Sequence, residues 1–304
     1  MRTIGMWMYQ NGGGDVIQKK IVQRLQEREI DTVTGLDLRF AHIDKEAVVC
    51  KGANVNDLDL FFSYNAGEQT AAQLYLYEVL GNLMPMVNNF PAFSLTEDKL
   101  RTNMALLAAG VKTSDFFLCH RECPGLLREK FEEWKRVVFK PLNGWGGSGM
   151  VLIEDARVLE MLIPALHREG ARHFYIERFI ENDFTDYRID IVDGDVVGCY
   201  GRKAKQREWR TNVSSGGSVI LRDPNDEVVA LAKKAAKAVG LEIAGVDIIY
   251  DTEHEEYVVL EVNGIPAFAT PEQEAMGIDF NERKIGKLVE LIDRRAGKER
   301  TQQS

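Results

Sequence analysis

Two neighbouring apolar segments near the carboxyl end of the chain carry three oxygen-bearing side chains, and this pattern constrains the fold more than any other. Asp247 lies within residues 244–250, and Glu261 and Asn263 lie within residues 257–263. The polar residues between the segments are typical of a hairpin turn, so the two segments are expected to pair as antiparallel strands. A register that sets Asp247 opposite the other two would gather two carboxylates and one carboxamide.

The strand pattern also decides which side chains share a face, because successive side chains point to opposite faces. Glu261 and Asn263 should lie on one face. The other face should carry Val258, Leu260 and Val262. Charges inside apolar strands are costly unless they are paired or bind a metal. Carboxylate and carboxamide oxygens are hard ligands that suit Mg2+ beside a nucleotide phosphate, with calcium or a solvent-facing polar edge as the alternatives.

Length and charge limit the class of protein. The 304 residues allow two or three lobes, and an apolar content of 45% supplies ordinary hydrophobic cores. The net charge of -9 argues against non-specific nucleic-acid binding, so no nucleic-acid partner is expected. Residues 1–9 are too short an apolar run for a signal peptide or a membrane span. We therefore expect a soluble, cytoplasmic protein with no membrane partner.

The cysteines give no sign of a zinc site. Cys50, Cys119, Cys123 and Cys199 do not form paired CxxC units. One histidine lies between the second and third of them, but no second ligand cluster follows at suitable spacing. Reduced structural thiols are the simpler interpretation.

The amino-terminal part has the pattern of a small α/β lobe that ends near residue 92. An apolar run over residues 4–8 is followed by a glycine loop at 12–14 and by a helical repeat that ends near Leu25. The glycine spacing is not GxGxxG, so a substrate-facing loop at the end of a parallel strand is favoured over a dinucleotide site. A strand, a helix and a strand are expected over residues 58–62, 70–80 and 85–89.

A helix is expected next, with Thr96 as its N-cap and Gly110 at its end. Its buried stripe would consist of Leu100, Met104, Leu107 and Ala108. Lys99 lies in the first turn, where the helix dipole disfavours a cation. That local cost favours a functional lysine, and a solvated surface lysine is the alternative.

A glycine-rich loop over residues 141–149 lies between two apolar strands. Four glycines in a hairpin loop expose backbone N–H groups that can fold over phosphates, and Lys140 before the loop adds a point charge. The loop is not a Walker A motif, because its lysine precedes the glycines and strands flank both ends. A merely flexible hairpin is the alternative.

The following segments alternate between strands and polar loops. Residues 174–180 form an expected strand that enters an acidic linker, where backbone groups can meet an adenine edge and a carboxylate can meet a ribose. Residues 201–210 are the one basic cluster of this acidic chain, and a small-residue loop at 214–218 follows, where a phosphate can approach. A solvated charged loop is the alternative. Helices are expected over residues 226–239 and 280–295.

Taken in order, these motifs resemble those of the ATP-grasp ligases, and within that superfamily the RimK-like glutamate ligases. The similarity runs from about Lys99 to Arg295. Its most specific motifs are Arg-Lys-Ala-Lys at 202–205, Trp-Arg-Thr-Asn at 209–212, Ala-Gly-Val-Asp-Ile at 244–248 and Glu-Val-Asn at 261–263. Their order and spacing carry the resemblance, rather than any single motif.

The resemblance implies an α/β fold of three α+β lobes, the ATP-grasp fold, with ATP held between two sheet-containing lobes. The expected bounds are 1–92 for an N-terminal α/β lobe, 93–173 for a central lobe with the glycine-rich loop, and 174–304 for a C-terminal lobe that binds ATP and Mg2+.

The resemblance also implies contacts with ATP. Lys99 and Lys140 would bind the phosphates, under a loop of residues 144–149 that includes Gly146, Gly147 and Ser148. The adenine hinge would comprise Glu177, Arg178, Phe179 and Ile180, and the ribose would meet Asp186 or Asp183. The remaining nucleotide contacts would be Lys205, Arg210, Thr211 and Asn212.

The catalytic residues implied in the same way are Lys140 and Arg210, with Arg210 steadying the transferred phosphoryl group. The implied ligands of two Mg2+ ions, or of Mn2+ in their place, are Asp247, Glu261 and Asn263. Glu261 is expected to bridge the two ions.

In the chemistry of these ligases ATP phosphorylates a carboxylate, an amine attacks the acyl phosphate, and phosphate leaves. Positioning and charge neutralisation carry such a reaction, which agrees with the lack of a Ser/His or Cys/His constellation in the sequence. We therefore expect an ADP-forming carboxylate–amine ligase, a homo-oligomer, that adds an amino acid such as glutamate to a small-molecule or peptide carboxylate. The alternatives are a non-catalytic ATP-binding regulatory protein and a phosphotransferase that stops at the phosphorylated product.

Three stretches depart from the RimK pattern. The hinge is similar to that of D-alanine ligases, and the tryptophan in the glycine-rich loop is similar to bacterial glutathione synthetase. After Asn263 the chain has Gly-Ile-Pro-Ala-Phe at 264–268 in place of Ala-Ser-Pro-Gly. This last stretch lies on the acceptor side, so the identity of the acid and of the amino acid does not follow from the resemblance.

Overall fold

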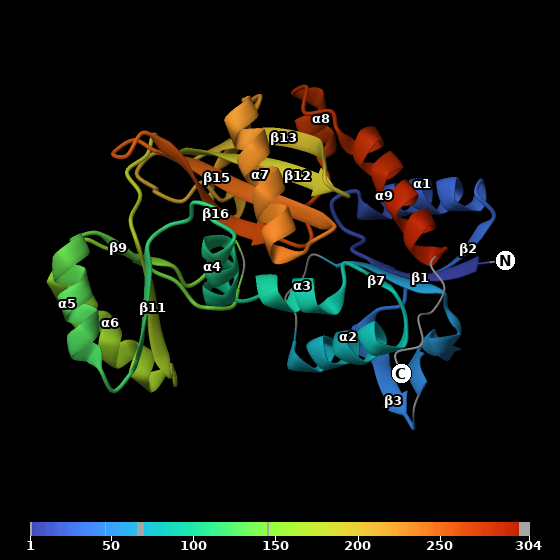
Figure 1. The fold of residues 1–304 in the computed structure, drawn as a ribbon, viewed down its shortest axis with the longest axis horizontal. Coiled ribbons are helices and arrows are strands. Elements are labelled where there is room, and N and C mark those ends of the chain that lie inside the picture. The colour runs from blue at the N-terminus through green and yellow to red at the C-terminus, as the bar shows by residue number, and fades with distance from the viewer. Residues whose placement is uncertain (1, 46, 66–69, 145, 298–304) are drawn as a thin grey trace.

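The computed structural model describes residues 2–45, 47–65, 70–144 and 146–297, which form a mixed α/β molecule of three lobes (Figure 1). Within these residues the strands form a parallel sheet in the first lobe, an antiparallel sheet in the second and a larger antiparallel sheet in the third. The expected α/β class is therefore confirmed. No helix in the described part of the chain combines the length and apolarity needed to cross a bilayer.

The N-terminal lobe has a parallel sheet in the order β2-β1-β6-β7. Its elements are β1 (Arg2–Met8), α1 (Gly14–Gln26), β2 (Ile30–Thr34), β6 (Leu60–Tyr64), α2 (Ala71–Leu83) and β7 (Met86–Val87). A small antiparallel sheet adds β3 (Ala41–Asp44), β4 (Ala47–Cys50) and β5 (Ala53–Asn54). Because parallel strands end at the same edge, the glycine loop after β1 lies beside the ends of β2 and β6, as the sequence predicted.

Two helices, α3 (Phe90–Thr96) and α4 (Lys99–Ala108), lead out of this lobe, and the expected helix start was wrong. Thr96 ends α3, and its hydroxyl donates to the backbone carbonyl of Phe93 at 3.0 Å. The N-cap of α4 is Asp98, whose carboxylate accepts from the backbone N–H of Arg101 at 2.9 Å. Lys99 nevertheless lies in the first turn, as expected.

The expected buried stripe of α4 was also wrong. Met104 and Leu107 are 55% and 51% exposed, whereas Asn103 and Leu106 are buried. The helix packs against α7 (Asp226–Val239), and Asn103 bonds to the hydroxyl of Tyr175 at 2.8 Å. A buried polar contact therefore decides which face of α4 is buried, and the apolar pattern of the sequence does not predict that face.

The central lobe has an antiparallel sheet in the order β10-β9-β11-β8, covered by two helices (Figure 1). Its elements are β8 (Phe116–His120), α5 (Pro124–Trp134), β9 (Val137–Phe139), β10 (Val151–Ile153), α6 (Ala156–Arg168) and β11 (His173–Arg178). The expected boundary at 173/174 cuts β11, which pairs with β8 and β9. Residues before β8 likewise belong elsewhere, because Leu106 and Val111 join the core of the third lobe.

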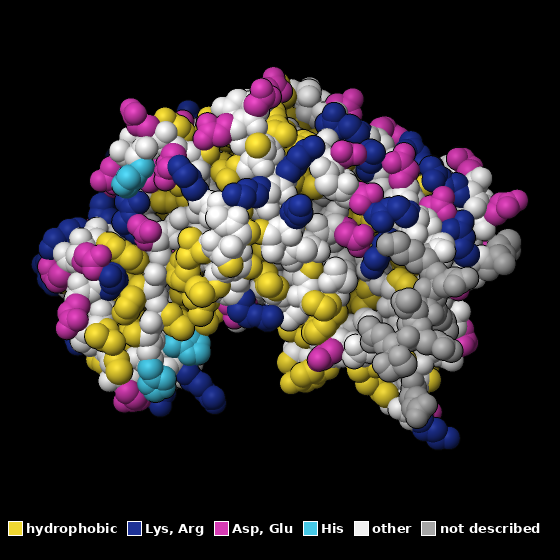
Figure 2. Space-filling view, in the orientation of Figure 1, with side chains coloured by type: hydrophobic (Ala, Val, Ile, Leu, Met, Phe, Trp, Pro, Cys, Tyr) yellow, Lys and Arg dark blue, Asp and Glu magenta, His cyan; other side chains and the backbone are white. Residues whose placement is uncertain are grey.

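The C-terminal lobe has a five-stranded sheet in the order β14-β13-β12-β15-β16. Its strands are β12 (Thr185–Val192), β13 (Asp195–Lys203), β14 (Ser218–Ile220), β15 (Ile243–Asp251) and β16 (Glu256–Asn263). Helix α7 crosses one face, and α8 (Pro271–Ala275) and α9 (Asn281–Ala296) follow the sheet. α9 lies beside α1 of the first lobe, and basic and acidic side chains mix along that seam (Figures 1 and 2).

The hairpin of β15 and β16 confirms the predicted pairing, since Asp247 lies opposite Glu261 and Gly245 opposite Asn263. The next paired residue after Glu261 is Val259, which leaves Leu260 as the extra residue of a β-bulge. The expected alternation was therefore wrong at Leu260, which lines a pocket together with Glu261.

Candidate active site

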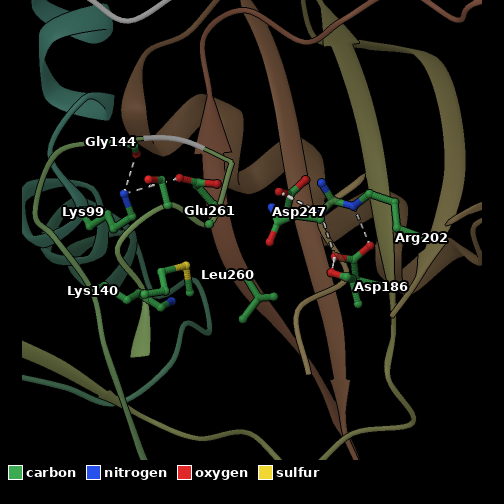
Figure 3. Close-up of a pocket in the computed structure, with 13 residues that line it drawn as sticks. Lys99, Lys140, Gly144, Asp186, Arg202, Asp247, Leu260 and Glu261 are labelled. Carbon is green, nitrogen blue, oxygen red and sulfur yellow. Dashed lines mark hydrogen bonds and ion pairs between the residues drawn. The ribbon is translucent and has the colours of Figure 1, made fainter. Parts of the chain in front are cut away.

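Two adjoining pockets lie between the central sheet and the C-terminal sheet. The apolar pocket is lined by Val138, Met150, Phe179, Ile180, Ile249 and Leu260. The polar pocket is lined by Lys99, Lys140, Asp186, Arg202, Asp247 and Glu261 (Figure 3). Lys140, Thr211, Asn212 and Leu260 line both pockets. A flat apolar group in one pocket can thus continue into a polyanion in the other.

Lys140 and Glu177 form a buried ion pair where the pockets meet. Lys140 directly follows β9 and Glu177 lies in the adjacent strand β11, and Nζ of Lys140 lies 2.5 Å from Oε2 of Glu177. Lys140 is 8% exposed and Glu177 is 2% exposed. The Glu177 carboxylate also accepts hydrogen bonds from Ser114 Oγ at 2.6 Å and from Tyr175 OH at 2.9 Å. Glu177 therefore orients Lys140, and its carboxylate does not face the apolar pocket as a free group.

The predicted hinge borders the apolar pocket with both side chains and backbone. Phe179 and Ile180 line it, and the Trp209 ring meets Phe179 edge-on at 6.4 Å. The N–H groups of Arg178 and Phe179 already donate to the carbonyls of Asp115 and Arg136. The Ile180 N–H has no partner among the described residues, so it is the hinge donor left for a ligand.

The glycine-rich loop is fastened to the opposite lobe. The carbonyl of Gly146 accepts from Ser214 Oγ at 2.6 Å, and that of Gly147 accepts from Arg210 Nη1 at 3.2 Å. Gly144, Gly146, Gly147 and Gly149 all have positive φ, which suits glycine. Ser148 lines the polar pocket, and Trp145 lies outside the described residues. The loop thus covers the polar pocket.

Lys99 links the loop to the acidic cluster (Figure 3). Its Nζ donates to the carbonyl of Gly144 at 2.8 Å and lies 3.8 Å from Oε1 of Glu261. The lysine singled out for its unfavourable helix position therefore points into the polar pocket. Nearby, burial raises the pKa of Glu97 to about 7, the charge of Glu261 adds to the rise, and Lys99 opposes it.

Asp247 is buried and held by two arginines. Its Oδ1 accepts from Arg188 Nε at 2.5 Å, and its Oδ2 accepts from Nη2 of Arg188 at 3.1 Å and lies 2.9 Å from Nη2 of Arg202. Burial by itself raises the pKa of Asp247, but the charges of Arg188 and Arg202 outweigh it and lower the pKa. Asp247 therefore stays ionised in the buried strand.

The three predicted metal ligands fit Mg2+. A carboxylate oxygen has two lone pairs, so Oδ1 of Asp247 keeps one beside its single bond to Arg188. Glu261 is partly open to the polar pocket, and Asn263 Nδ2 donates to its Oε2 at 3.3 Å. Two carboxylates and one carboxamide on paired strands form a hard oxygen donor set.

Neither of the two predicted ribose residues, Asp186 and Asp183, lines the apolar pocket. Asp186 is fully buried, and both its oxygens are engaged, by Arg202 at 2.9 and 2.6 Å and by Thr211 Oγ1 at 2.5 Å. It lines the polar pocket and not the apolar one. Asp183 also has a local partner, because it accepts from the Thr185 hydroxyl at 2.7 Å.

The basic loop after β13 is only partly in the site. Arg210 lines the apolar pocket and is held by Glu208, with Nη2 2.9 Å from Oε2. Thr211 and Asn212 line both pockets. Lys205 is exposed and lines none of the pockets described here, because β13 ends at Lys203 and the chain then turns outward. Its predicted contact with the nucleotide has no support in this arrangement.

Two residues of the site, Arg188 and Arg202, were missed by sequence reasoning. Both pair with Asp247, and Arg202 bridges Asp247 and Asp186 (Figure 3). The sequence could have identified them, because each is a charged residue inside an apolar strand. A charge in an apolar strand was also the reason for choosing Asp247 as a site residue.

Of the cavities larger than the polar pocket, two extend towards the N-terminal lobe. The lateral cavity, of ≈ 390 Å³, is lined by Glu97, Arg188, Arg202, Glu261, Asn263 and Ile265, among others. The N-terminal cavity, of ≈ 900 Å³, is lined by Tyr9, Gly12, Asp37, Arg39, Lys51 and Phe268, among others. Glu261 and Arg202 line both the polar pocket and the lateral cavity, so the two adjoin.

Comparison with known proteins decides the family. The RimK-like ATP-grasp domain matches residues 96–288, which is more than half of the chain. The chain belongs to the RimK-like ATP-grasp family. The RimK-like match includes α4, the glycine-rich loop, the hinge and the Asp247 hairpin, so every element of the two pockets lies within it.

Curated relatives of this RimK-like chain are glutamate ligases. A probable alpha-L-glutamate ligase of Thioalkalivibrio sulfidiphilus is 34% identical over 235 residues, covering 76% of this chain and 74% of the relative. The tetrahydromethanopterin:alpha-L-glutamate ligase of Methanocaldococcus jannaschii is 30% identical over 245 residues, covering 78% of this chain and 81% of the relative. The RimK-like chain is therefore an ATP-dependent, ADP-forming carboxylate–amine ligase, and nothing among these relatives favours a non-catalytic regulator.

Solved structures share the fold. A RimK domain ATP-grasp protein of Sphaerobacter thermophilus has a TM-score of 0.71 at 16% identity, covering 95% of this chain and 98% of that one. The ATP-grasp ligase PsnB, solved with a precursor variant, Mg and ADP, has a TM-score of 0.64 at 16% identity, covering 96% of this chain and 99% of PsnB. The RimK-like chain thus has the ATP-grasp fold over nearly its whole length.

Proposed function

We propose that this ligase adds glutamate, or a closely related amino acid, to the carboxylate of a small molecule or peptide. The observation that carries the proposal is that three spaces adjoin: Asn212 lines the apolar pocket, the polar pocket and the lateral cavity. Such a path can hold a nucleotide base, its phosphates and a second substrate in sequence. The choice of glutamate rests on the names of the relatives.

The nucleotide is proposed to lie with adenine in the apolar pocket and its phosphates in the polar pocket. Phe179, Ile180 and Leu260 would contact the base, and the free N–H of Ile180 would donate to its edge. Lys140 and Lys99 would bind the phosphates beneath the glycine-rich loop. Lys140 is suited to this role because Glu177 already holds its ammonium group between the two pockets.

Asp247, Glu261 and Asn263 are proposed as the residues that would hold two Mg2+ ions, or Mn2+ in their place. Bound metal would neutralise the phosphate charge during transfer. The chain's own residues then divide the remaining tasks. Arg210 would steady the transferred phosphoryl group from the loop side, and Arg188 and Arg202 would offset negative charge in the lateral cavity.

The proposed reaction has two steps. The γ-phosphoryl group passes from ATP to the acid, which forms an acyl phosphate and ADP, and the amine then attacks the acyl carbon. The carbon–nitrogen bond forms, the amine loses a proton and phosphate leaves. The polar pocket and the lateral cavity share Glu261, so both steps can occur without moving the intermediate far.

The test is release of ADP and phosphate with pairs of acids and amino acids. Rates should rise only when both substrates are present. Glu261→Ala should lower kcat by about 100-fold or more, as expected when charge stabilisation at a transferring phosphoryl group is lost. ADP formation at full rate in Glu261→Ala would sink the metal assignment, and phosphate retained on the acid would indicate a phosphotransferase. Thermal stabilisation by nucleotide, with no product from any pair, would favour the regulator.

Assembly and compartment are proposed as well. The four cysteines are free, which supports a reducing compartment, and together with ATP use this favours the cytoplasm. A homo-oligomer is proposed, and light scattering coupled to size exclusion would measure it.

A further inference from the structure

The N-terminal cavity, of ≈ 900 Å³, is a space that the reaction above does not use. It lies at the carboxyl ends of β1, β2 and β6, where Tyr9, Thr34 and Asn65 contribute to its wall. Its ≈ 900 Å³ exceeds the ≈ 390 Å³ of the lateral cavity. An amino acid alone would occupy the lateral cavity and leave the N-terminal cavity filled with water.

The N-terminal cavity and the lateral cavity adjoin. Asn65, Ala267, Phe268 and Thr270 line both of them. The junction is rigid and partly aromatic, because the Phe268 N–H donates to the Tyr9 hydroxyl at 3.2 Å and the Phe268 ring lies 5.5 Å from that of Tyr64. A ligand that extends from the lateral cavity into the N-terminal lobe therefore passes beside fixed apolar surface.

The far end of the N-terminal cavity is positively charged, in a chain whose net charge is -9. Among the described residues that line it, Asp37 is the only acid, and its carboxylate is engaged by the Arg39 guanidinium at 2.6 Å. The hydrogen bond from Arg39 lowers the pKa of Asp37, so this pair is neutral in sum. Lys51 has no ion-pair partner among the described residues and leaves one unbalanced cation in the wall.

We propose that the N-terminal cavity binds the remote end of an extended acid substrate that carries a second anionic group. Lys51 recognises that group, Arg39 assists it, and Tyr9 with Phe268 packs against the apolar middle of the substrate. The reacting carboxylate lies in the lateral cavity beside Glu261 and Asn263. The inference rests on the proposed function, because it assigns the acid of that reaction to a class: elongated, with a flat or apolar middle and a distal carboxylate or phosphate.

Binding to the nucleotide-free protein tests the inference without catalysis. The probes are 4-phenylbutanoate and its two para-substituted forms, which carry a carboxylate or a phosphate on the ring. Titration calorimetry should show that both dianionic probes bind more tightly than 4-phenylbutanoate. Loss of a hydrogen-bonded charge contact corresponds to about a tenfold change in Kd, so Lys51→Glu should weaken the dianionic probes by about tenfold or more. Comparison of the two para groups distinguishes a carboxylate from a phosphate.

Lys19→Glu is the matched control, because Lys19 is an exposed lysine of the same lobe that does not line the cavity. It should leave the Kd of every probe unchanged. The inference is overturned if the dianionic probes bind no better than 4-phenylbutanoate or do not bind at millimolar concentration. It is also overturned if Lys51→Glu and Lys19→Glu change the Kd of the dianionic probes by the same factor. ADP release with the same acids reports on the ligase separately. Lys51-dependent binding without ADP release would keep the cavity assignment and count against the reaction.

Discussion

At the scale of single residues, Glu177 shows how one buried carboxylate organises a site. It accepts hydrogen bonds from Lys140, Ser114 and Tyr175, and it is almost completely buried. A buried ion pair contributes little net stability compared with apolar packing, but loss of one partner leaves an unpaired charge. The pair is thus better understood as a device that fixes Lys140 between the two pockets.

Glu177→Gln should therefore destabilise the nucleotide-free protein by about 3 kcal/mol, because the Lys140 ammonium loses its counter-ion. Urea unfolding measures this. Adding Lys140→Met should recover most of the loss, since no buried charge then remains unpaired. A double variant as unstable as Glu177→Gln would show that the hydrogen bonds of Glu177 matter, rather than its charge.

Glu97 predicts a pH dependence. Burial raises its pKa from 4.5 to about 7, so the folded state holds a proton that the unfolded state releases first. Below pH 4.5 Glu97 is protonated in both states and does not change the free energy of unfolding. Between pH 4.5 and about 7 the free energy of unfolding falls as the pH rises, because only the unfolded state has lost the proton. Above about pH 7 the cost of the buried charged Glu97 is fully present. In metal-free protein, Glu97→Gln should thus be more stable than wild type at about pH 8 and equal to it at about pH 4. Parallel stability curves for the two proteins would contradict this.

At the scale of elements, the hairpin of β15 and β16 shows what sequence can and cannot give. Strand alternation and a polar turn were enough to predict that the two strands pair antiparallel, and the structure adds the register in which Asp247 lies opposite Glu261. The bulge at Leu260 was not predictable, since one extra residue in a strand leaves no mark in composition. Yet at the bulge both Leu260 and Glu261 line the polar pocket, so an apolar contact and a polar ligand lie side by side.

Helix α4 was also predicted only in part. Its existence and the placement of Lys99 followed from local signals, whereas its N-cap and its buried face did not. Thr96 and Asp98 are both good caps, and the choice between them depends on how α3 ends. Burial of Asn103 depends on Tyr175, which is 72 positions away in the sequence. Long-range polar contacts of this kind cannot be inferred from periodicity.

The glycine-rich loop offers a paired test of closure. A Cβ at Gly147 would lie 3.1 Å from Asn212 Oδ1 and 3.4 Å from Arg210 Cδ, whereas a Cβ at Gly144 would meet nothing within 4 Å. Both have positive φ, so both alanine variants share the backbone strain. Overpacking costs roughly 1–3 kcal/mol, so Gly147→Ala should lower kcat/KM for ATP about tenfold more than Gly144→Ala. Equal losses would mean that strain alone matters and that the loop does not close against Asn212.

At the scale of the whole molecule, α9 connects the C-terminal sheet to the N-terminal lobe. It packs against β12, β13 and α1, and its residues join one hydrophobic core with β1 and β6. The lobe boundaries expected from sequence therefore describe segments of chain rather than independent cores. Because the N-terminal lobe shares its core with α9, both cavities of the acceptor side are built from two lobes at once.

Lys284 lies at the centre of this connection. It is fully buried on α9, and its Nζ donates to Asp190 of β12 at 2.7 Å and to the carbonyls of Pro266 and Ala267 at 2.9 Å each. The Tyr64 hydroxyl from the first lobe donates to the same Pro266 carbonyl at 2.5 Å. Lys284 thus holds the stretch after Asn263, which departs from the RimK pattern and lines both cavities.

Lys284→Met should have two separable effects. It leaves the Asp190 carboxylate buried without a cation, which should cost about 3 kcal/mol or more in urea unfolding, and it frees the 264–268 stretch, which should raise KM for the acid without changing KM for ATP. Lys287→Met is the control, because Lys287 of the same helix forms only partly exposed ion pairs, with Asp195 and Glu290.

The double variant Asp190→Asn with Lys284→Met separates charge from position. It removes the buried carboxylate charge, so most of the lost stability should return. The carbonyls of Pro266 and Ala267 still lack their donor, so KM for the acid should stay raised. If both the free energy of unfolding and KM for the acid return towards their wild-type values, Lys284 only neutralises Asp190. Recovery of stability alone would make Lys284 a positioning residue through which the last helix sets the shape of the acid site.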